Sequence, residues 1–299
     1  MRAALSQVEV VRPRGLDHAL DLLSEPADRR PTPLAGGTDL FVYLNAGDES
    51  RGRFLDLSPL RGLRGIRVVG GTVTIGALAT FREIREHAVI RRRLPALSAA
   101  AAEVGGWQIQ NRATLAGNIA NASPAGDSLP VLLALDAVVR VASKRGVRDL
   151  PIHRVFTGYR KLAFDPDELI VSIAIPFPSA GTVTFFRKVG TRRAQSISKV
   201  VFCGSIAFGR GRGRSGGTPH HVQLAYGSMA AVPLRAEAAE GVLLEGPPSA
   251  ERARAARLAL AEDLTPIDDV RSDRDYRMDV AGNVLDQFLR NASPGYTRS

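Results

Sequence analysis

A short glycine-rich stretch near the start of the chain has the residue types of an anion site. It runs from Leu34 to Leu40 and reads LAGGTDL, a glycine pair followed by a hydroxyl and a carboxylate. Because glycine has no Cβ, such a backbone can approach phosphate oxygens closely and offer several N–H donors. Apolar residues resume at Phe41, which predicts a helix after the turn. Taken alone this pattern is a weak signal, because Gly-Gly-Thr-Asp is more often an ordinary turn than an anion site.

A second stretch of small and polar residues lies farther along the chain. It runs from Ala113 to Asp127 and reads ATLAGNIANASPAGD. We expect a loop as far as Pro124, then a helix that Asp127 and Ser128 could cap. A loop with so many amides and hydroxyls either satisfies its own buried backbone or holds a polar ligand, and the residue types leave both open.

Several familiar site classes are missing from the sequence. No G-x-G-x-x-G follows a predicted strand, and no Walker lysine loop is present. The one cysteine, Cys203, excludes an internal disulfide and a cysteine-ligated zinc or iron–sulfur site. Its apolar flanks favour a buried structural thiol. Any nucleotide site must therefore use another fold.

Hydrophobic periodicity predicts a mixed α+β chain that divides near residue 178. Strands are expected at 8–11, 54–57, 66–69, 73–75, 137–142, 168–175, 183–187, 199–208 and 221–225, and helices at 15–24, 80–86 and 94–104, with two more helices at the end. In the last helix, Tyr276, Val280, Val284 and Phe288 recur every fourth residue and predict a buried stripe.

The formal net charge of +10 comes mainly from arginine. A basic surface can serve nucleic acid, an anionic membrane or an acidic partner, and a compositional bias towards arginine explains it equally well. The Arg/Gly run from Gly209 to Gly217 would suit single-stranded nucleic acid, but it lacks interleaved aromatics. No apolar run approaches ~20 residues, and no signal-peptide core is visible, so we expect no membrane span and a cytoplasmic location.

Two further groups have less weight. His220 and His221 have no nearby carboxylate in sequence and are expected to be a surface pair, so no metal site is predicted. Trp107 follows a glycine pair and precedes the second polar stretch. It is expected to pack against the protein, with a place beside a bound ring as the alternative.

Long motifs along the chain resemble one known family. Gln110 to Pro124 is similar to the FAD-binding signature of the medium subunit of molybdenum hydroxylases, the xanthine dehydrogenase and aerobic carbon monoxide dehydrogenase family, and Ala35 to Asp39 resembles its other FAD loop. The family's C-terminal domain is resembled by 186–199, 225–228, 233–235 and 273–276. The matches follow the family's order over nearly the whole chain.

The resemblance implies a vanillyl-alcohol-oxidase (PCMH-type) FAD-binding domain over residues 1–178, in lobes of about 1–60 and 61–178. A smaller C-terminal α+β domain, an antiparallel sheet with helices, would cover 179–290, with a tail at 291–299. The implied cofactor contacts are Pro33, Leu34, Ala35, Gly36, Gly37, Thr38, Asp39, Leu40, Ala113, Thr114, Gly117, Asn118, Asn121, Asp127, Ile170 and Lys188.

Within that set, the resemblance implies that 35–39 and 114–118 hold the pyrophosphate, and that Asn121 and Asp127 hydrogen-bond the ribityl or phosphate region. Ile170 and Lys188 match positions near the flavin and adenine ends. Ala116 stands where the family commonly has glycine, so a slight shift is expected. No catalytic side chain is implied.

The implied function is electron transfer. Substrate would be hydroxylated at a molybdopterin cofactor on a large partner subunit, and electrons would pass through two [2Fe–2S] clusters on a small subunit to FAD here, then to an external acceptor. A self-sufficient flavin oxidase and a nucleic-acid-binding protein are the alternatives. The substrate and the acceptor are not encoded in this chain.

Overall fold

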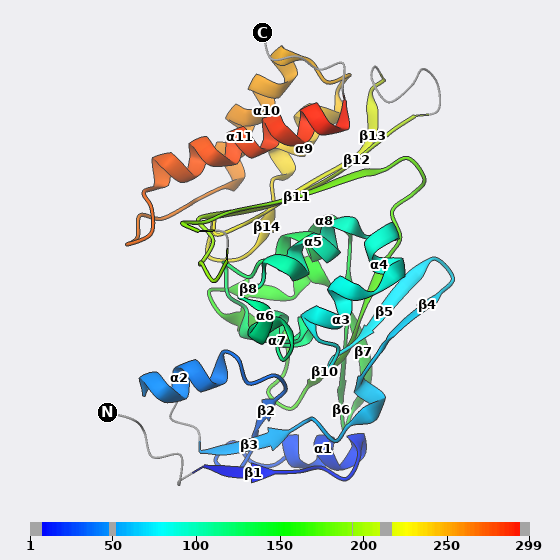
Figure 1. Cartoon of the computed structure of the whole chain (residues 1–299), viewed down its shortest axis with the longest axis vertical. Coiled ribbons are helices and arrows are strands. Elements are labelled where there is room, and N and C mark those ends of the chain that lie inside the picture. The colour runs from blue at the N-terminus through cyan, green and yellow to red at the C-terminus, as the bar shows by residue number, and fades with distance from the viewer. Residues whose placement is uncertain (1–7, 48–51, 193, 210–216, 294–299) are drawn as a thin grey trace.

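The computed structural model describes residues 8–47, 52–192, 194–209 and 217–293. Three layered parts follow one another from the N-terminus to the C-terminus (Figure 1). Among the described helices, none is long and apolar enough to cross a membrane.

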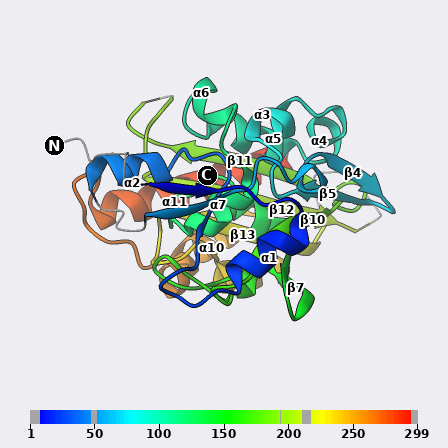
Figure 2. The ribbon, with the colours of Figure 1, turned by 90° about the horizontal axis from the view of Figure 1, so that it is seen from below.

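The first part is a small parallel sheet with one covering helix. Its elements are β1 (Glu9–Val11), α1 (Leu16–Leu23), β2 (Thr32–Leu34), α2 (Leu40–Ala46) and β3 (Arg53–Asp56), with strand order β1-β3-β2. Helix α1 buries Ala19, Leu20 and Leu23 against the core. Helix α2 buries only Leu44 and extends to one side of the molecule (Figures 1 and 2).

The second part is an antiparallel sheet in the order β4-β5-β10-β6-β7, with a helical layer on it. Its strands are β4 (Ile66–Val69), β5 (Thr72–Gly76), β6 (Val138–Ser143), β7 (Gly146–Pro151) and β10 (Leu169–Pro176), and a separate hairpin is formed by β8 (Phe156–Gly158) and β9 (Lys161–Leu162). Its helices are α3 (Phe81–Glu86), α4 (Ala88–Arg93), α5 (Pro95–Glu103), α6 (Trp107–Gln110), α7 (Leu115–Asn121) and α8 (Leu129–Ala134), and two 3-10 turns are η2 (Arg61–Leu63) and η3 (Ile152–Arg154). The strands expected at 66–69 and 73–75 form a hairpin, and both residues of its turn, Gly70 and Gly71, have positive φ.

The third part is an antiparallel sheet in the order β11-β12-β13-β14, covered by three helices. Its elements are β11 (Val183–Val189), β12 (Val200–Phe208), β13 (Pro219–Gly227), β14 (Leu234–Arg235), α9 (Glu237–Leu244), α10 (Ala250–Asp263) and α11 (Arg274–Ala292). Helices α5 and α8 contact one face of this sheet, and α9 and α11 contact the other (Figure 1). Strand β12 is buried on both faces, which explains its nearly continuous apolar run.

The expected loop at 113–124 is wrong in its central part, because Leu115–Asn121 is helix α7. Alanine, leucine and isoleucine tolerate a helix, and the Thr114 hydroxyl accepts a hydrogen bond from the Gly117 N–H at the start. The helix ends at Ala122, whose φ of 47° is left-handed. Helices α4 and α6 were also not foreseen, since each has fewer residues than a clear helical period needs.

Two finer expectations also differ from the structure. Ser128 precedes α8, but its side chain donates to Asn118 and makes no capping bond. In α11, Val284 and Phe288 are buried as expected, whereas Tyr276 is 42 % exposed and lies against the Lys199 ammonium. The buried stripe therefore does not include the first turn of the helix. The Arg/Gly run lies mostly outside the described residues.

Candidate functional site

Both glycine-rich stretches line a single cleft of about 1400 Å³. The turn between β2 and α2 forms one wall, α7 and the turn before α8 form another, and segments of the C-terminal part close the end. Every residue of the expected cofactor set lines this cleft except Lys188. Ala116 lines it as well.

The two stretches are packed against each other backbone to backbone. A Cβ on Gly36 would lie 2.1 Å from the Arg112 carbonyl oxygen, a separation that atoms do not tolerate. Gly37 has φ of 75°, a left-handed conformation that favours glycine. The glycine pair therefore has a physical cause: the first turn must lie directly on the chain that leads into α7.

Helix α7 presents small side chains and two amides, those of Asn118 and Asn121, to the cleft. The Asn118 side chain is fixed by the Ser128 hydroxyl, which donates to its Oδ1 at 2.7 Å. Ala116 is buried, and its methyl group is accommodated. The polar residues of this stretch therefore fill both roles that the sequence left open: some make hydrogen bonds within the protein, and others face the cleft.

One end of the cleft is closed by a buried ion pair. The Lys188 Nζ donates to Asp127 Oδ2 at 2.7 Å and to the Glu103 carbonyl at 2.9 Å, and the Ser198 hydroxyl donates to Asp127 Oδ1 at 2.6 Å. Burial raises the pKa of Asp127, while Lys188 and Ser198 oppose that rise. Because Lys188 and Ser198 come from the C-terminal part, this pair joins the two sides of the cleft.

The other end carries a more open polar chain. Asn121 Nδ2 donates to Asp39 Oδ2 at 3.2 Å, and Asn121 Oδ1 accepts from both the Tyr43 hydroxyl and the Arg160 guanidinium at 3.1 Å. Arg160 also donates to the Tyr43 hydroxyl at 2.7 Å. Asp39 keeps contact with solvent through the cleft. Partial burial raises its pKa, and the charge of Arg160 offsets only part of that rise.

A third polar group at the cleft was missed by the sequence reasoning. Asp269 accepts from Arg277 at 2.7 Å and from Arg271 at 2.9 Å, and Arg277 also donates to the carbonyls of Lys199 and Ser228. Burial raises the pKa of Asp269, but these hydrogen bonds and the nearby guanidinium charge outweigh it and bring the pKa to about 2. The only sequence signal was the motif that begins at Asp273, just beyond this loop.

The shape and chemistry of the cleft fit a flavin dinucleotide. Its volume exceeds the ~1,000 Å³ that large small-molecule pockets reach, so it suits an extended ligand. The glycine turn allows close approach of phosphate oxygens. Apolar side chains from Leu162, Phe164 and Ile170 line another part of the wall and suit a flat ring.

Other candidate residues lie away from this cleft. The expected packing of Trp107 against the protein is wrong, because its side chain is 68 % exposed with Arg85 stacked over the ring at 4.1 Å, and Trp107 does not line the cleft either. Cys203 is fully buried, as expected, and burial raises its thiol pKa. His221 is hydrogen-bonded to Ser205, and within the described residues no cluster of His, Cys, Asp or Glu could hold a metal ion.

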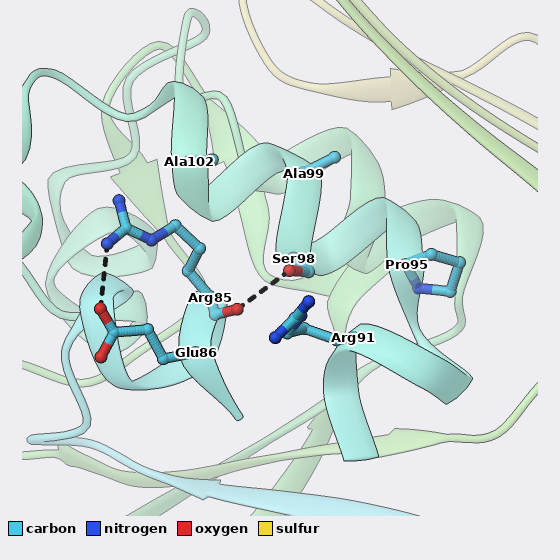
Figure 3. Close-up of a pocket in the computed structure, with 7 residues that line it drawn as sticks. All are labelled: Arg85, Glu86, Arg91, Pro95, Ser98, Ala99 and Ala102. Atoms are coloured by element: carbon cyan, nitrogen blue, oxygen red, sulfur yellow. Dashed lines mark hydrogen bonds and ion pairs between the residues drawn. The ribbon is translucent and has the colours of Figure 1, made fainter. Parts of the chain in front are cut away.

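A second, smaller hollow of about 480 Å³ lies on the outer side of α3, α4 and α5 (Figure 3). Arg85 and Arg91 project beside it, and Arg85 is held by Glu86 at 3.1 Å while its carbonyl accepts from Ser98. Alanine and proline form most of the remaining lining, so this hollow has no converging donors for a dinucleotide.

The fold and the cleft are those of a flavoprotein subunit. Residues 6–178 match the model of the FAD binding domain in molybdopterin dehydrogenase, and residues 185–292 match the CO dehydrogenase flavoprotein C-terminal domain. The chain belongs to this family of FAD-binding dehydrogenase subunits and is an oxidoreductase subunit.

Individual relatives agree with this assignment. The chain is 34 % identical to the nicotinate dehydrogenase FAD-subunit of Eubacterium barkeri, over 80 % of this chain and 85 % of that protein. It is 30 % identical to the xanthine dehydrogenase FAD-binding subunit of Escherichia coli O157:H7, over 93 % of both. A chain of carbon monoxide dehydrogenase from Hydrogenophaga pseudoflava superposes with a TM-score of 0.88 at 28 % identity, covering 95 % of this chain and 96 % of that one.

Proposed function

We propose that this chain is the electron outlet of a cytoplasmic, molybdenum-dependent hydroxylase complex. Electrons would arrive from [2Fe–2S] clusters on a small subunit and leave to an external acceptor, while a large subunit with the molybdopterin cofactor hydroxylates the substrate. The cleft that brings both glycine stretches together is the observation that supports this most directly. FAD supplies the redox chemistry, and the protein supplies position and electrostatics.

The cleft residues would divide the cofactor between them. The backbones of 35–39 and 114–118 would hold the pyrophosphate, since both stretches line the cleft. Asn121 and Asp127 would hydrogen-bond the ribityl or phosphate region. Ile170 would pack on a ring, and Lys188 would act through Asp127, because it contacts that carboxylate and does not line the cleft.

We also propose that the chain is organised as an FAD-binding unit of two lobes followed by a C-terminal unit, with the division near residue 178. Two apolar clusters support this, one centred on the antiparallel sheet of 66–176 and one between the second sheet and its helices. The extents of the two family matches agree with such a division.

A rapid-mixing experiment tests the electron path. The FAD-loaded chain is mixed without oxygen with a chemically reduced [2Fe–2S] subunit from the same genome, and flavin absorbance is followed. We expect the reduced [2Fe–2S] subunit to reduce the flavin after mixing. We expect organic substrates not to reduce the flavin of the chain alone. Reduction of its own flavin by an organic substrate would instead identify a self-sufficient flavin oxidase.

A further inference from the structure

Arg160 occupies an unusual place on the wall of the cleft. It is the second residue of the two-residue turn between β8 and β9, where Gly158 pairs with Lys161. Its φ of 53° is left-handed, a region that favours glycine or asparagine and costs energy for a long side chain. An arginine at such a position points to a role for its guanidinium.

The charges along the cleft are mostly paired within the protein. Each of the following carboxylates is bonded to a cation: Asp127 to Lys188, Asp165 to Arg145, Glu168 to Arg148, and Asp269 to Arg271 and Arg277. Arg160 differs, because within the described part of the chain its hydrogen-bond and ring partners are the uncharged Tyr43, Asn121 and Tyr159. The charge of Arg160 acts on the nearby Asp39 carboxylate, but these two side chains form no ion pair, so the guanidinium can still bind a ligand.

The position of this charge identifies the part of the ligand it faces. Arg160 shares Asn121 with Asp39, and Asp39 directly follows the glycine pair. Arg160 and Asp39 both line the cleft, but no direct bond joins them. The guanidinium thus lies on the same cleft wall as the glycine turn, whose backbone lines the cleft.

We propose that Arg160 binds the diphosphate of FAD and that Tyr43 and Asn121 hold its guanidinium in position. A guanidinium suits this task because its N–H groups match pairs of phosphate oxygens. The inference rests on FAD binding in this cleft and adds a cationic side chain to the backbones of 35–39 and 114–118 that would hold the diphosphate.

Binding to the flavin-free full-length chain tests the proposal with three ligands. FAD affinity is measured by fluorescence, and ADP and adenosine are measured by competition with FAD. Arg160→Gln should weaken FAD and ADP by roughly 10–100-fold, the range of a charge-assisted hydrogen bond, and leave adenosine within about twofold. Arg160→Lys should fall between the wild type and Arg160→Gln, because it keeps the charge and loses the planar fork.

Lys161→Gln is the matched control. It removes the same charge from the next residue of the hairpin, but Lys161 does not line the cleft. All three affinities should stay at the wild-type values. Added salt should weaken ADP binding more in the wild type than in Arg160→Gln, because one charge pair is already absent from the variant.

Arg160→Gly separates binding from folding. Glycine suits the left-handed φ, so the flavin-free variant should unfold at a temperature no lower than the wild type while ADP binding is lost to the same extent as in Arg160→Gln. Equal losses for adenosine and ADP, or no loss for either, would overturn the proposal. A wild-type chain that binds neither FAD nor ADP would overturn the FAD site together with it.

Discussion

The two ends of the cleft solve the problem of placing charge beside a cofactor in opposite ways. At the boundary with the C-terminal part, Lys188 and Asp127 neutralise each other, with side chains only 5 % and 10 % exposed. At the other end, Asp39 and Arg160 are separated by Asn121 and open to solvent. The comparison teaches that the first end uses its charges to hold the protein together, whereas the second keeps a charge for a ligand.

Lys188→Met should have the largest effect. It leaves the Asp127 carboxylate buried without its cation and should lower the free energy of unfolding by about 3–5 kcal/mol, measured by chemical denaturation. Lowering the pH should reduce this loss, because the pKa of Asp127 is already raised and the carboxyl can take up a proton. Arg187→Met, an exposed neighbour on the same strand, is the control; equal losses in both variants would remove the contrast between the two ends.

Gly36→Ala should disturb the region between the two ends. Its methyl group would meet the Arg112 carbonyl oxygen, so the two glycine stretches must separate. We expect a loss of ~1–3 kcal/mol in unfolding free energy, as for overpacking, and a clear loss of FAD affinity. Gly62→Ala has open space around its Cβ and should change neither quantity. Normal FAD binding by Gly36→Ala would show that the close approach is unnecessary.

Acid should reveal the contribution of Asp269, on the C-terminal wall. Its pKa falls from 3.8 to about 2 on folding, so its stabilisation is complete above pH 3.8 and disappears as the pH falls through 2. One pKa unit is ~1.4 kcal/mol, and because solvent screens this partly exposed carboxylate, the contribution is about 1 kcal/mol, less than the full shift would give. Between pH 5 and pH 2, the free energy of unfolding should change less with pH for Asp269→Asn than for the wild type. Identical slopes would contradict this account.

Tyr43→Phe should have the smallest effect. It removes the hydroxyl between Arg160 and Asn121, but this end of the cleft is open and water can replace the hydrogen bond. The loss of unfolding free energy should stay below about 1 kcal/mol. FAD affinity should fall only a few-fold, because the guanidinium keeps Asn121 as a partner. A loss as large as that of Lys188→Met would mean that both ends are structural.

Local sequence signals predicted the elements well where one residue type has one clear role. The helix expected at 80–86 begins with a capping box between Thr80 and Glu83, and Gly70–Gly71 forms the turn between the strands expected at 66–69 and 73–75. The same reasoning misassigned Leu115–Asn121 as loop, because small residues and asparagine are common to loops and to helices that face a cleft. The resemblance in this stretch was informative about function while its local composition was misleading about structure.

Long-range pairing was the part that composition and spacing could not predict. Lys188 and Asp127 are 61 residues apart, and Arg160 reaches Tyr43 over 117 residues. Such contacts depend on how sheets and helical layers meet in space. Motif matching still placed Asp127 and Lys188 in one functional set, but it gave no sign that Arg160, Tyr43 or Asp269 belong at the same cleft.

The helical layer between the two large sheets limits how this chain can be divided. Helix α8 contacts β12, β13 and β14 of the C-terminal sheet. Two residues of that sheet, Cys203 and Ala225, belong to the apolar cluster of the FAD-binding part. A fragment cut near residue 178 would therefore expose a broad apolar surface and aggregate. The two halves of the subunit are therefore stable only as parts of one chain.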